Sequence, residues 1–213
     1  MERLSVSPGP IAIIRTNHPV PDQVFGALVE GGIRLIEITL GTPQCLETIA
    51  RWLDFGGASV GVGSIRTLAD AKQAIEAGAQ FLVTPTTQDA ILKVSTEAGT
   101  PVVCGAMSPT EIDSAWQQGA ASVKIFPADS LGKVSYVKSL KGPLPEIRLS
   151  PTGGVSVDDA ASYAAAGCWG VGVGSNLVSQ HTLETRDWEA LAARAKDYQR
   201  AWAEGVLHRD ADQ

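Results

Sequence analysis

Cysteine is scarce in this chain of 213 residues, which contains only Cys45, Cys104 and Cys168. The three lie far apart and form no CxxC pair, so the sequence lacks the spacing of a disulfide framework or of a cysteine zinc site. Isolated cysteines of this kind fit a reducing compartment, and we expect a cytoplasmic location. The opening residues, MERLSVSPGP, have no basic start followed by an apolar run, so no signal peptide is predicted.

Recognisable motifs for metals and nucleotide cofactors are also lacking. Only three histidines are present, and no group of His, Asp and Glu residues has the spacing of metal ligands. The glycine-rich segment GVGVGS at 170–175 does not have the GxGxxG spacing of a dinucleotide fingerprint. We therefore predict neither a metal nor a cofactor.

Positive charge is in deficit. Seventeen Lys and Arg residues stand against 23 Asp and Glu residues, which gives a formal net charge of −6. This balance argues against nucleic acid and against an anionic membrane as main partners. The uncharged stretch at 160–183 is too rich in glycine and polar residues to span a bilayer. An anionic substrate would need a site that is built locally.

Apolar residues, by contrast, make up 44% of the chain and recur in short runs rich in Ile and Val. The runs occupy residues 10–15, 33–39, 59–64, 80–84, 101–105, 121–126, 147–151 and 169–174. Their starts lie 20 to 26 residues apart, which is the interval that successive strand–helix units produce. The runs are nearly continuous, as expected of parallel strands that are covered on both faces.

The segments between these runs have the features of helices. Four of them, 21–31, 67–78, 108–119 and 156–167, show helical spacing or a capping residue and end on glycine just before the next run. A last amphipathic helix is expected at 186–204, followed by a frayed tail at 206–213. Eight such units predict a single α/β domain over residues 1–213, folded as a (β/α)8 barrel; an open doubly wound sheet is the alternative.

Charged residues interrupt three of the predicted strands near their carboxyl ends, at Arg15, Glu37 and Lys124. Side chains alternate between the two faces of a strand, so the apolar neighbours of each charge should face the helices. We therefore expect all three charged side chains to point into the mouth of the barrel, where active sites of this fold form. The second and sixth strands lie opposite each other in an eight-stranded closure, so Glu37 and Lys124 can converge.

A lysine next to a carboxylate in a barrel mouth suggests imine chemistry. An ordinary lysine amine is protonated at neutral pH, but burial or nearby positive charge favours its nucleophilic form. A neighbouring carboxyl group can then transfer protons. A buried structural ion pair is the alternative interpretation of the same two residues.

Two glycine-rich loops follow the seventh and eighth predicted strands. Thr152, Gly153 and Gly154 leave the seventh, and Gly174 and Ser175 leave the eighth. Loops at these positions of a barrel commonly bind phosphate through backbone N–H groups, which need no lysine. Ordinary turn glycines are the alternative.

Together these residues resemble the family of 2-keto-3-deoxy-6-phosphogluconate (KDPG) aldolases, which also act as 4-hydroxy-2-oxoglutarate (KHG) aldolases. The resemblance covers about residues 11–178. It rests on the segments GGIRLIEITL, VGVGSIRT, FLVTP, CGAMSPTE, ASVKIFPAD, LSPTGGV and GVGVGSNLV, which occur in order and at matching spacing.

The resemblance implies a class I aldolase without a metal, in which Lys124 forms a Schiff base and Glu37 is the general acid and base. It also implies that Arg15, with Ser64, binds the pyruvate carboxylate, and that Pro85 and Phe126 line the substrate pocket. Thr152, Gly153, Gly154, Gly174 and Ser175 would hold the substrate phosphate. The substrate would be a small phosphorylated keto acid, and the assembly a homotrimer.

The sequence departs from the family pattern at three positions. Ser64 replaces a threonine that is common in the family, Cys104 replaces a proline, and Gly41 stands where some members carry an arginine. We infer that Arg15 supplies the missing carboxylate partner from another strand. Three alternatives stay open: a phosphogalactonate aldolase, a non-covalent isomerase or synthase on the same barrel, and a phosphosugar-binding protein without enzymatic activity.

Overall fold

The computed structural model of the chain describes residues 8–211. In this range eight parallel strands form one sheet in the order β7-β6-β5-β4-β3-β2-β1-β8. The strands are β1 (Gly9–Ile14), β2 (Leu35–Thr39), β3 (Ser59–Gly63), β4 (Phe81–Val83), β5 (Val102–Ala106), β6 (Ser122–Ile125), β7 (Leu149–Pro151) and β8 (Gly170–Val173). The ends of each lie within one residue of those of a predicted run, except that β2 and β7 start two residues later than predicted.

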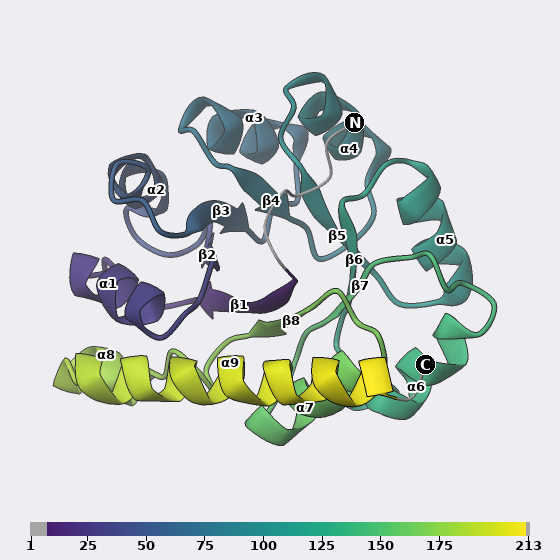
Figure 1. Cartoon of the computed structure of the whole chain (residues 1–213). Coiled ribbons are helices and arrows are strands. Elements are labelled where there is room, and N and C mark those ends of the chain that lie inside the picture. Colours follow the sequence, from purple (N-terminus) through teal and green to yellow (C-terminus); the bar gives the residue numbers. More distant parts are fainter. Residues whose placement is uncertain (1–7, 212–213) are drawn as a thin grey trace.

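The two end strands, β7 and β8, meet and close the sheet into a barrel. A parallel bridge pairs Thr152 with Gly172, and the N–H of Trp169 donates to the carbonyl of Leu149 over 2.9 Å. The predicted (β/α)8 barrel is therefore confirmed, and the open sheet is excluded. Figure 1 shows the helices arranged around the outside of these strands.

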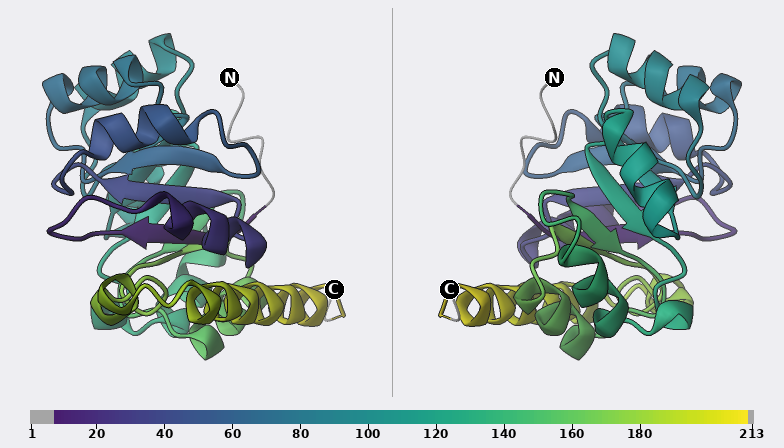
Figure 2. Two further views of the ribbon diagram at one scale, coloured as in Figure 1. Left: turned by 90° about the vertical axis from the view of Figure 1, so that its left-hand side faces the viewer. Right: turned by 90° about the vertical axis from the view of Figure 1, so that its right-hand side faces the viewer.

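The α-helices follow the strands along the chain, one after each strand except that two follow β8. They are α1 (Asp22–Glu30), α2 (Cys45–Trp52), α3 (Leu68–Glu76), α4 (Asp89–Glu97), α5 (Pro109–Gln117), α6 (Val134–Lys141), α7 (Val157–Ala165), α8 (Gln180–Thr185) and α9 (Trp188–Ala211). In Figure 2, α9 runs along one side of the barrel, where it packs against α7.

The end of the chain differs from the prediction. The last helix starts at Trp188, because Arg186 takes a left-handed conformation with φ of 57° and ends α8. It then continues to Ala211, so residues 206–211 of the expected frayed tail are helical. Leu191, Ala195, Tyr198 and Trp202 are buried on one side of α9, which explains its length. Residues 212–213 lie outside the described range.

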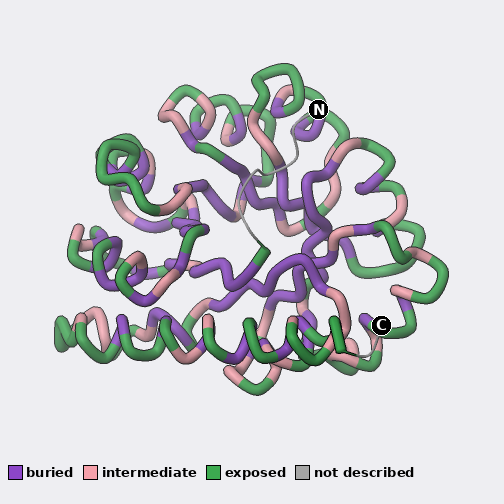
Figure 3. Tube along the Cα trace, in the orientation of Figure 1, coloured by how far each residue is buried: buried purple, intermediate pink, exposed green. Residues whose placement is uncertain are grey.

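Side-chain alternation divides the core into two layers. Ile36 and Ile38 belong to the larger cluster between the strands and the helices, whereas Leu35 belongs to a smaller cluster inside the barrel with Phe81 and other residues. Buried residues accordingly follow the strands in Figure 3, and exposed ones follow the outer faces of the helices. Glu37 shares the inner face with Leu35, as predicted.

Candidate active site

A cavity of about 420 Å³ opens at the carboxyl ends of the strands. Its lining includes all eleven residues that the sequence singled out, namely Arg15, Glu37, Ser64, Pro85, Lys124, Phe126, Thr152, Gly153, Gly154, Gly174 and Ser175. These residues come from the ends of seven strands and the loops that follow them, which are distant in the sequence. The barrel therefore brings the whole predicted set to one place.

Five further residues line the same cavity: Ile13, Val155, Asn176, Val178 and Gln180. Alternation along β1 places Ile13 on the same face as Arg15, so a stricter use of the pattern would have found it. Asn176 directly follows the second glycine loop. Val155 and Val178 end two of the segments that carry the family resemblance, whereas no sequence motif marks Gln180.

Lys124 and Glu37 enter the cavity from opposite sides of the barrel. They lie on β6 and β2, which are four strands apart in a ring of eight. Both are buried, with Lys124 9% exposed and Glu37 2% exposed. The ion pairs found within residues 8–211 do not include one between them. The amine and the carboxyl group thus share a compartment without neutralising each other by direct contact.

The carboxyl group of Glu37 is strongly affected by its surroundings. Burial raises its pKa, while the positive charges of Lys124 and Arg15 act in the opposite direction. Burial is the largest effect, so the pKa lies above its ordinary value. A carboxyl group with a raised pKa can donate as well as accept a proton closer to neutral pH.

Gly63 leaves the space that this carboxyl group occupies. A Cβ built on Gly63, at the end of β3, would lie 1.6 Å from Oε1 of Glu37. No real side chain fits there without displacing the glutamate. On the other side of the cavity, Nζ of Lys124 lies 5.1 Å from the centroid of the Phe126 ring, which is within cation–π range.

Arg15 and Ser64 form the polar corner of the cavity. Nη2 of Arg15 donates to Oγ of Ser64 over 3.3 Å. Ser64 has a left-handed backbone with φ of 61°, which is uncommon for a residue other than glycine and costs about 1 kcal/mol or more. Such strain is typical of functional positions. Among residues 8–211 the guanidinium group of Arg15 has no other hydrogen-bond or ion-pair partner, so it keeps N–H donors suited to a carboxylate.

The two glycine loops form the opposite end of the cavity. Gly153 and Gly154 have φ of 107° and 65°, which favours glycine at both positions. Within the described part of the chain, the backbone N–H groups of Gly154 and Ser175 donate no hydrogen bond to the protein, whereas Gly153 lies next to the bridge between Thr152 and Gly172. Donors of this kind, gathered at a loop, can bind an anion.

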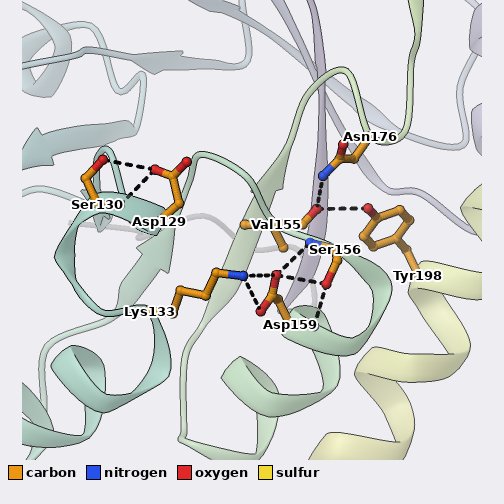
Figure 4. Close-up of polar contacts among 8 residues, drawn as sticks. All are labelled: Asp129, Ser130, Lys133, Val155, Ser156, Asp159, Asn176 and Tyr198. Atoms are coloured by element: carbon orange, nitrogen blue, oxygen red, sulfur yellow. Dashed lines mark hydrogen bonds and ion pairs between the residues drawn. The ribbon is translucent and has the colours of Figure 1, made fainter.

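A shared carbonyl group ties the loops together. The carbonyl of Val155 accepts hydrogen bonds from Nδ2 of Asn176 and from the hydroxyl of Tyr198, each over 2.9 Å (Figure 4). Below it, Ser156 and Asp159 form a capping box at the start of α7, and Asp159 also pairs with Lys133 at 3.0 Å. The loop geometry is therefore fixed by the protein itself.

Other reactive groups lie outside the cavity. The three cysteines are free and buried, and burial raises the pKa of the Cys45 and Cys168 thiols to about 12. Across residues 8–211, no group of three or more His, Cys, Asp or Glu side chains is placed to hold a metal ion. Over the same range, no helix is long and apolar enough to cross a membrane.

Comparisons with known proteins agree on one family. A family model described as KDPG and KHG aldolase matches residues 9–194. The 2-dehydro-3-deoxy-phosphogluconate aldolase of Dickeya dadantii is 33% identical over 191 residues, covering 88% of this chain and 87% of that protein. The 2-dehydro-3-deoxy-6-phosphogalactonate aldolase of Escherichia coli is 32% identical over 197 residues, covering 90% of this chain and 95% of that protein.

A solved structure described as native KDPGal superposes with a TM-score of 0.83 at 29% identity, covering 93% of this chain and 96% of the other. The family match spans most of the chain, and both relatives exceed 30% identity over nearly its full length. The chain therefore belongs to the KDPG and KHG aldolase family and is an aldolase, a type of lyase.

Proposed function

We propose that this chain is a class I aldolase that cleaves KDPG to pyruvate and glyceraldehyde 3-phosphate through a Schiff base on Lys124. One observation carries the proposal: a buried lysine and a buried carboxyl group reach the same cavity from opposite strands without an ion pair between them. A purely structural charge pair would be in contact. Separation leaves room for a keto acid between the two groups.

In the proposed first half of the reaction, the unprotonated amine of Lys124 attacks the C2 carbonyl of the substrate and forms a carbinolamine. Glu37 delivers a proton to the departing hydroxyl, water leaves, and a protonated imine remains. The raised pKa of Glu37 suits it to hold that proton. Arg15 and Ser64 would meanwhile orient the substrate carboxylate.

In the second half, the carboxylate of Glu37 removes the proton of the C4 hydroxyl. The C3–C4 bond breaks, its electron pair moves into the imine to give an enamine, and glyceraldehyde 3-phosphate leaves. The enamine is then protonated at C3, and water hydrolyses the imine to release pyruvate and the free amine. No external oxidant, reductant or metal is needed.

The glycine loops support a phosphorylated substrate. The free N–H groups of Gly154 and Ser175 would bind the phosphate, with Thr152, Gly153 and Gly174 shaping the loops, while Pro85 and Phe126 would form apolar walls. KHG presents the same reacting atoms without the phosphate, so we propose that it is cleaved less efficiently.

The galactonate version of the substrate is a specific second candidate. The gluconate and galactonate relatives are 33% and 32% identical to this chain, so identity does not separate them. The two substrates differ in configuration at C4, next to Glu37 in the proposed pose. Steady-state kcat/KM on both substrates decides between them, and we expect the larger value for the gluconate form.

Trapping of the imine tests the mechanism. Borohydride reduction in the presence of pyruvate should add a reduced pyruvate adduct to the peptide that contains Lys124. Lys124→Met should abolish the adduct and turnover, whereas Lys138→Met, on the exposed face of α6, should retain both. A native chain that binds pyruvate but gives no adduct would instead favour a non-covalent isomerase or synthase, and detectable wild-type turnover in Lys124→Met would refute the role of this lysine.

The family resemblance implies the assembly, and the isolated cysteines indicate the location. We propose that the chain forms a homotrimer and acts in the cytoplasm. Light scattering of the purified chain should give three times the mass of the single chain. A monomeric mass would refute the trimer without affecting the proposed chemistry.

A further inference from the structure

A second cavity, of about 600 Å³, lies at the end of the barrel opposite the catalytic cavity. Arg148 and Trp169, which directly precede β7 and β8, line one side of it. Trp202 and Leu207 of α9 line the other. The cavity therefore lies against the amino-terminal ends of the two strands whose carboxyl ends carry the glycine loops.

The walls of this cavity combine apolar surface with positive charge. Trp169 and Trp202 provide flat apolar walls, and Leu207 is 71% exposed at the rim. The charged lining residues are Lys141, Arg148, Arg209 and Glu146, three cations against one carboxylate. This local excess of positive charge contrasts with the net charge of −6 of the whole chain.

Two of the cations are not neutralised by an acidic partner. Arg209 pairs with Asp210 at 2.9 Å. Lys141 instead donates to the carbonyls of Pro145 and Ile147 over 3.2 and 2.7 Å, and Arg148 forms no ion pair within the described part of the chain.

Arg148 is the most informative of these residues. Its Nη1 atom is buried and has no hydrogen-bond partner among residues 8–211. The guanidinium carbon lies 6.0 Å from the centroid of the Trp169 ring, so the charge is held beside an aromatic wall. A buried guanidinium donor without a partner is rare, because such groups are costly to leave unsatisfied.

We propose that this cavity is a second binding site, for a small molecule with an aromatic body and a single carboxylate. The tryptophans would contact the apolar body, and the guanidinium group of Arg148, which lines the cavity, would bind the carboxylate. Lys141 would add favourable charge. This site is independent of the imine chemistry, because none of its lining residues lines the catalytic cavity.

The probe for this proposal is 2-naphthoate, compared with the neutral 2-naphthylmethanol. Calorimetry on the full-length native chain should show saturable binding of 2-naphthoate and binding at least about tenfold weaker for the alcohol. In a spectrum of the ¹⁵N-labelled chain, the indole N–H signals of Trp169 and Trp202 should shift. Those of Trp52, Trp116 and Trp188, which do not line the cavity, should stay in place.

Variants separate this site from the catalytic one, which also attracts carboxylates. Arg148→Met should weaken 2-naphthoate binding about tenfold or more. Arg200→Met, an exposed arginine of α9 outside the cavity, and Lys124→Met should leave it unchanged. Leu207→Asp alters an exposed rim residue, so the fold should persist while binding of the anion weakens.

Each result of these experiments either supports or overturns the proposed second site. Failure of 2-naphthoate to saturate the native chain, equal affinity for the alcohol, or unaltered affinity in Arg148→Met would each overturn the proposal. Loss of binding in Lys124→Met alone would place the probe in the catalytic cavity and overturn it as well. Failure of borohydride trapping would not affect this site.

Discussion

The carboxyl group of Glu37 shows how a single residue is tuned by its place in the fold. Its neighbours on β2 are buried isoleucines, and its own side chain points into a closed space with Lys124 and Arg15. Desolvation raises the pKa more than these two charges lower it. Sequence spacing identified the three charged residues, but the balance of these effects depends on distances that only the folded barrel defines.

This balance between burial and nearby charge predicts how the stability of Glu37→Gln, compared with that of the native chain, depends on pH. Since the pKa of Glu37 is higher in the folded than in the unfolded chain, its contribution to stability is complete at low pH and is lost as pH rises through the folded pKa. Glutamine cannot ionise. The free energy of unfolding of Glu37→Gln minus that of the native chain should therefore increase as the pH rises above the ordinary glutamate pKa of about 4.3. Urea denaturation at each pH measures this.

The same variant separates catalysis from stability. If Glu37 is the general acid and base, Glu37→Gln should lower kcat by roughly 10²- to 10⁴-fold. Glu204→Gln, on the exposed side of α9, controls for the loss of one charge. A stability difference that stays flat or falls with pH would contradict the raised pKa, whatever the kinetics.

Gly63 offers a second test at the residue scale. In Gly63→Ala the new methyl group would overlap the carboxyl group of Glu37, which must rotate or shift away from the cavity. We expect kcat to fall by about tenfold or more, and the free energy of unfolding to decrease by about 1–3 kcal/mol. Steady-state kinetics and urea denaturation measure the two effects.

Gly41→Ala is the matched control, because a Cβ on Gly41 meets nothing within 4 Å. Equal kinetics for Gly63→Ala and Gly41→Ala would show that Glu37 tolerates displacement. The importance of Gly63 was not predictable from the sequence, where it is one glycine of a GVGS segment. Its role arises only because β3 runs beside β2 and pairs Gly63 with Thr39.

At the scale of elements, the local interactions that cap helices were the most predictable part of the fold. Ser108 precedes Glu111 by three residues, which is the sequence spacing of a capping box, and the two form one at the start of α5. The start of α9 was misplaced because the left-handed conformation of Arg186 has no sequence signal. Backbone strain at a residue other than glycine depends on tertiary contacts rather than on local propensity.

The tie between the glycine loops gives a prediction at this scale. Tyr198→Phe removes one of the two hydrogen bonds to the Val155 carbonyl, while Asn176 still satisfies it. We expect stability to fall by about 1 kcal/mol and KM for KDPG to rise. KM for KHG, which carries no phosphate, should change little. Steady-state kinetics on the two substrates measure the contrast.

Tyr136→Phe is the control, since it also removes a hydrogen bond from a tyrosine hydroxyl to a backbone carbonyl, that of Met107, at a position outside the cavity. Equal effects of Tyr198→Phe on both substrates would argue against a phosphate site at the loops. Such a result would leave the imine chemistry intact.

At the scale of the whole molecule, the regular spacing of the apolar runs predicted the barrel. It did not predict how closely β7 and β8 would pair where the barrel closes. Counting eight strands implies that β7 meets β8, and they do meet. The seam, meaning the contact between β7 and β8, contains few paired residues, and the reason is local. The N–H of Thr152 points to β6, where it donates to Ile125, so the adjacent position in β7 faces β8; that position is Pro151, which has no N–H to donate.

The seam is therefore the place where a small change should affect the entire barrel. A Cβ on Gly172 would lie 2.3 Å from Oγ1 of Thr152 and 3.0 Å from Cδ1 of Ile13, so Gly172→Ala forces apart the bridge that joins β7 to β8. We expect the free energy of unfolding to fall by about 1–3 kcal/mol, measured by urea denaturation. Thr152→Ala in the same chain removes the clashing atoms and should restore part of the loss.

Because the seam joins the two glycine loops, we also expect KM for KDPG to rise in Gly172→Ala. A single variant as stable as the native chain would mean that the barrel does not depend on this contact for closure.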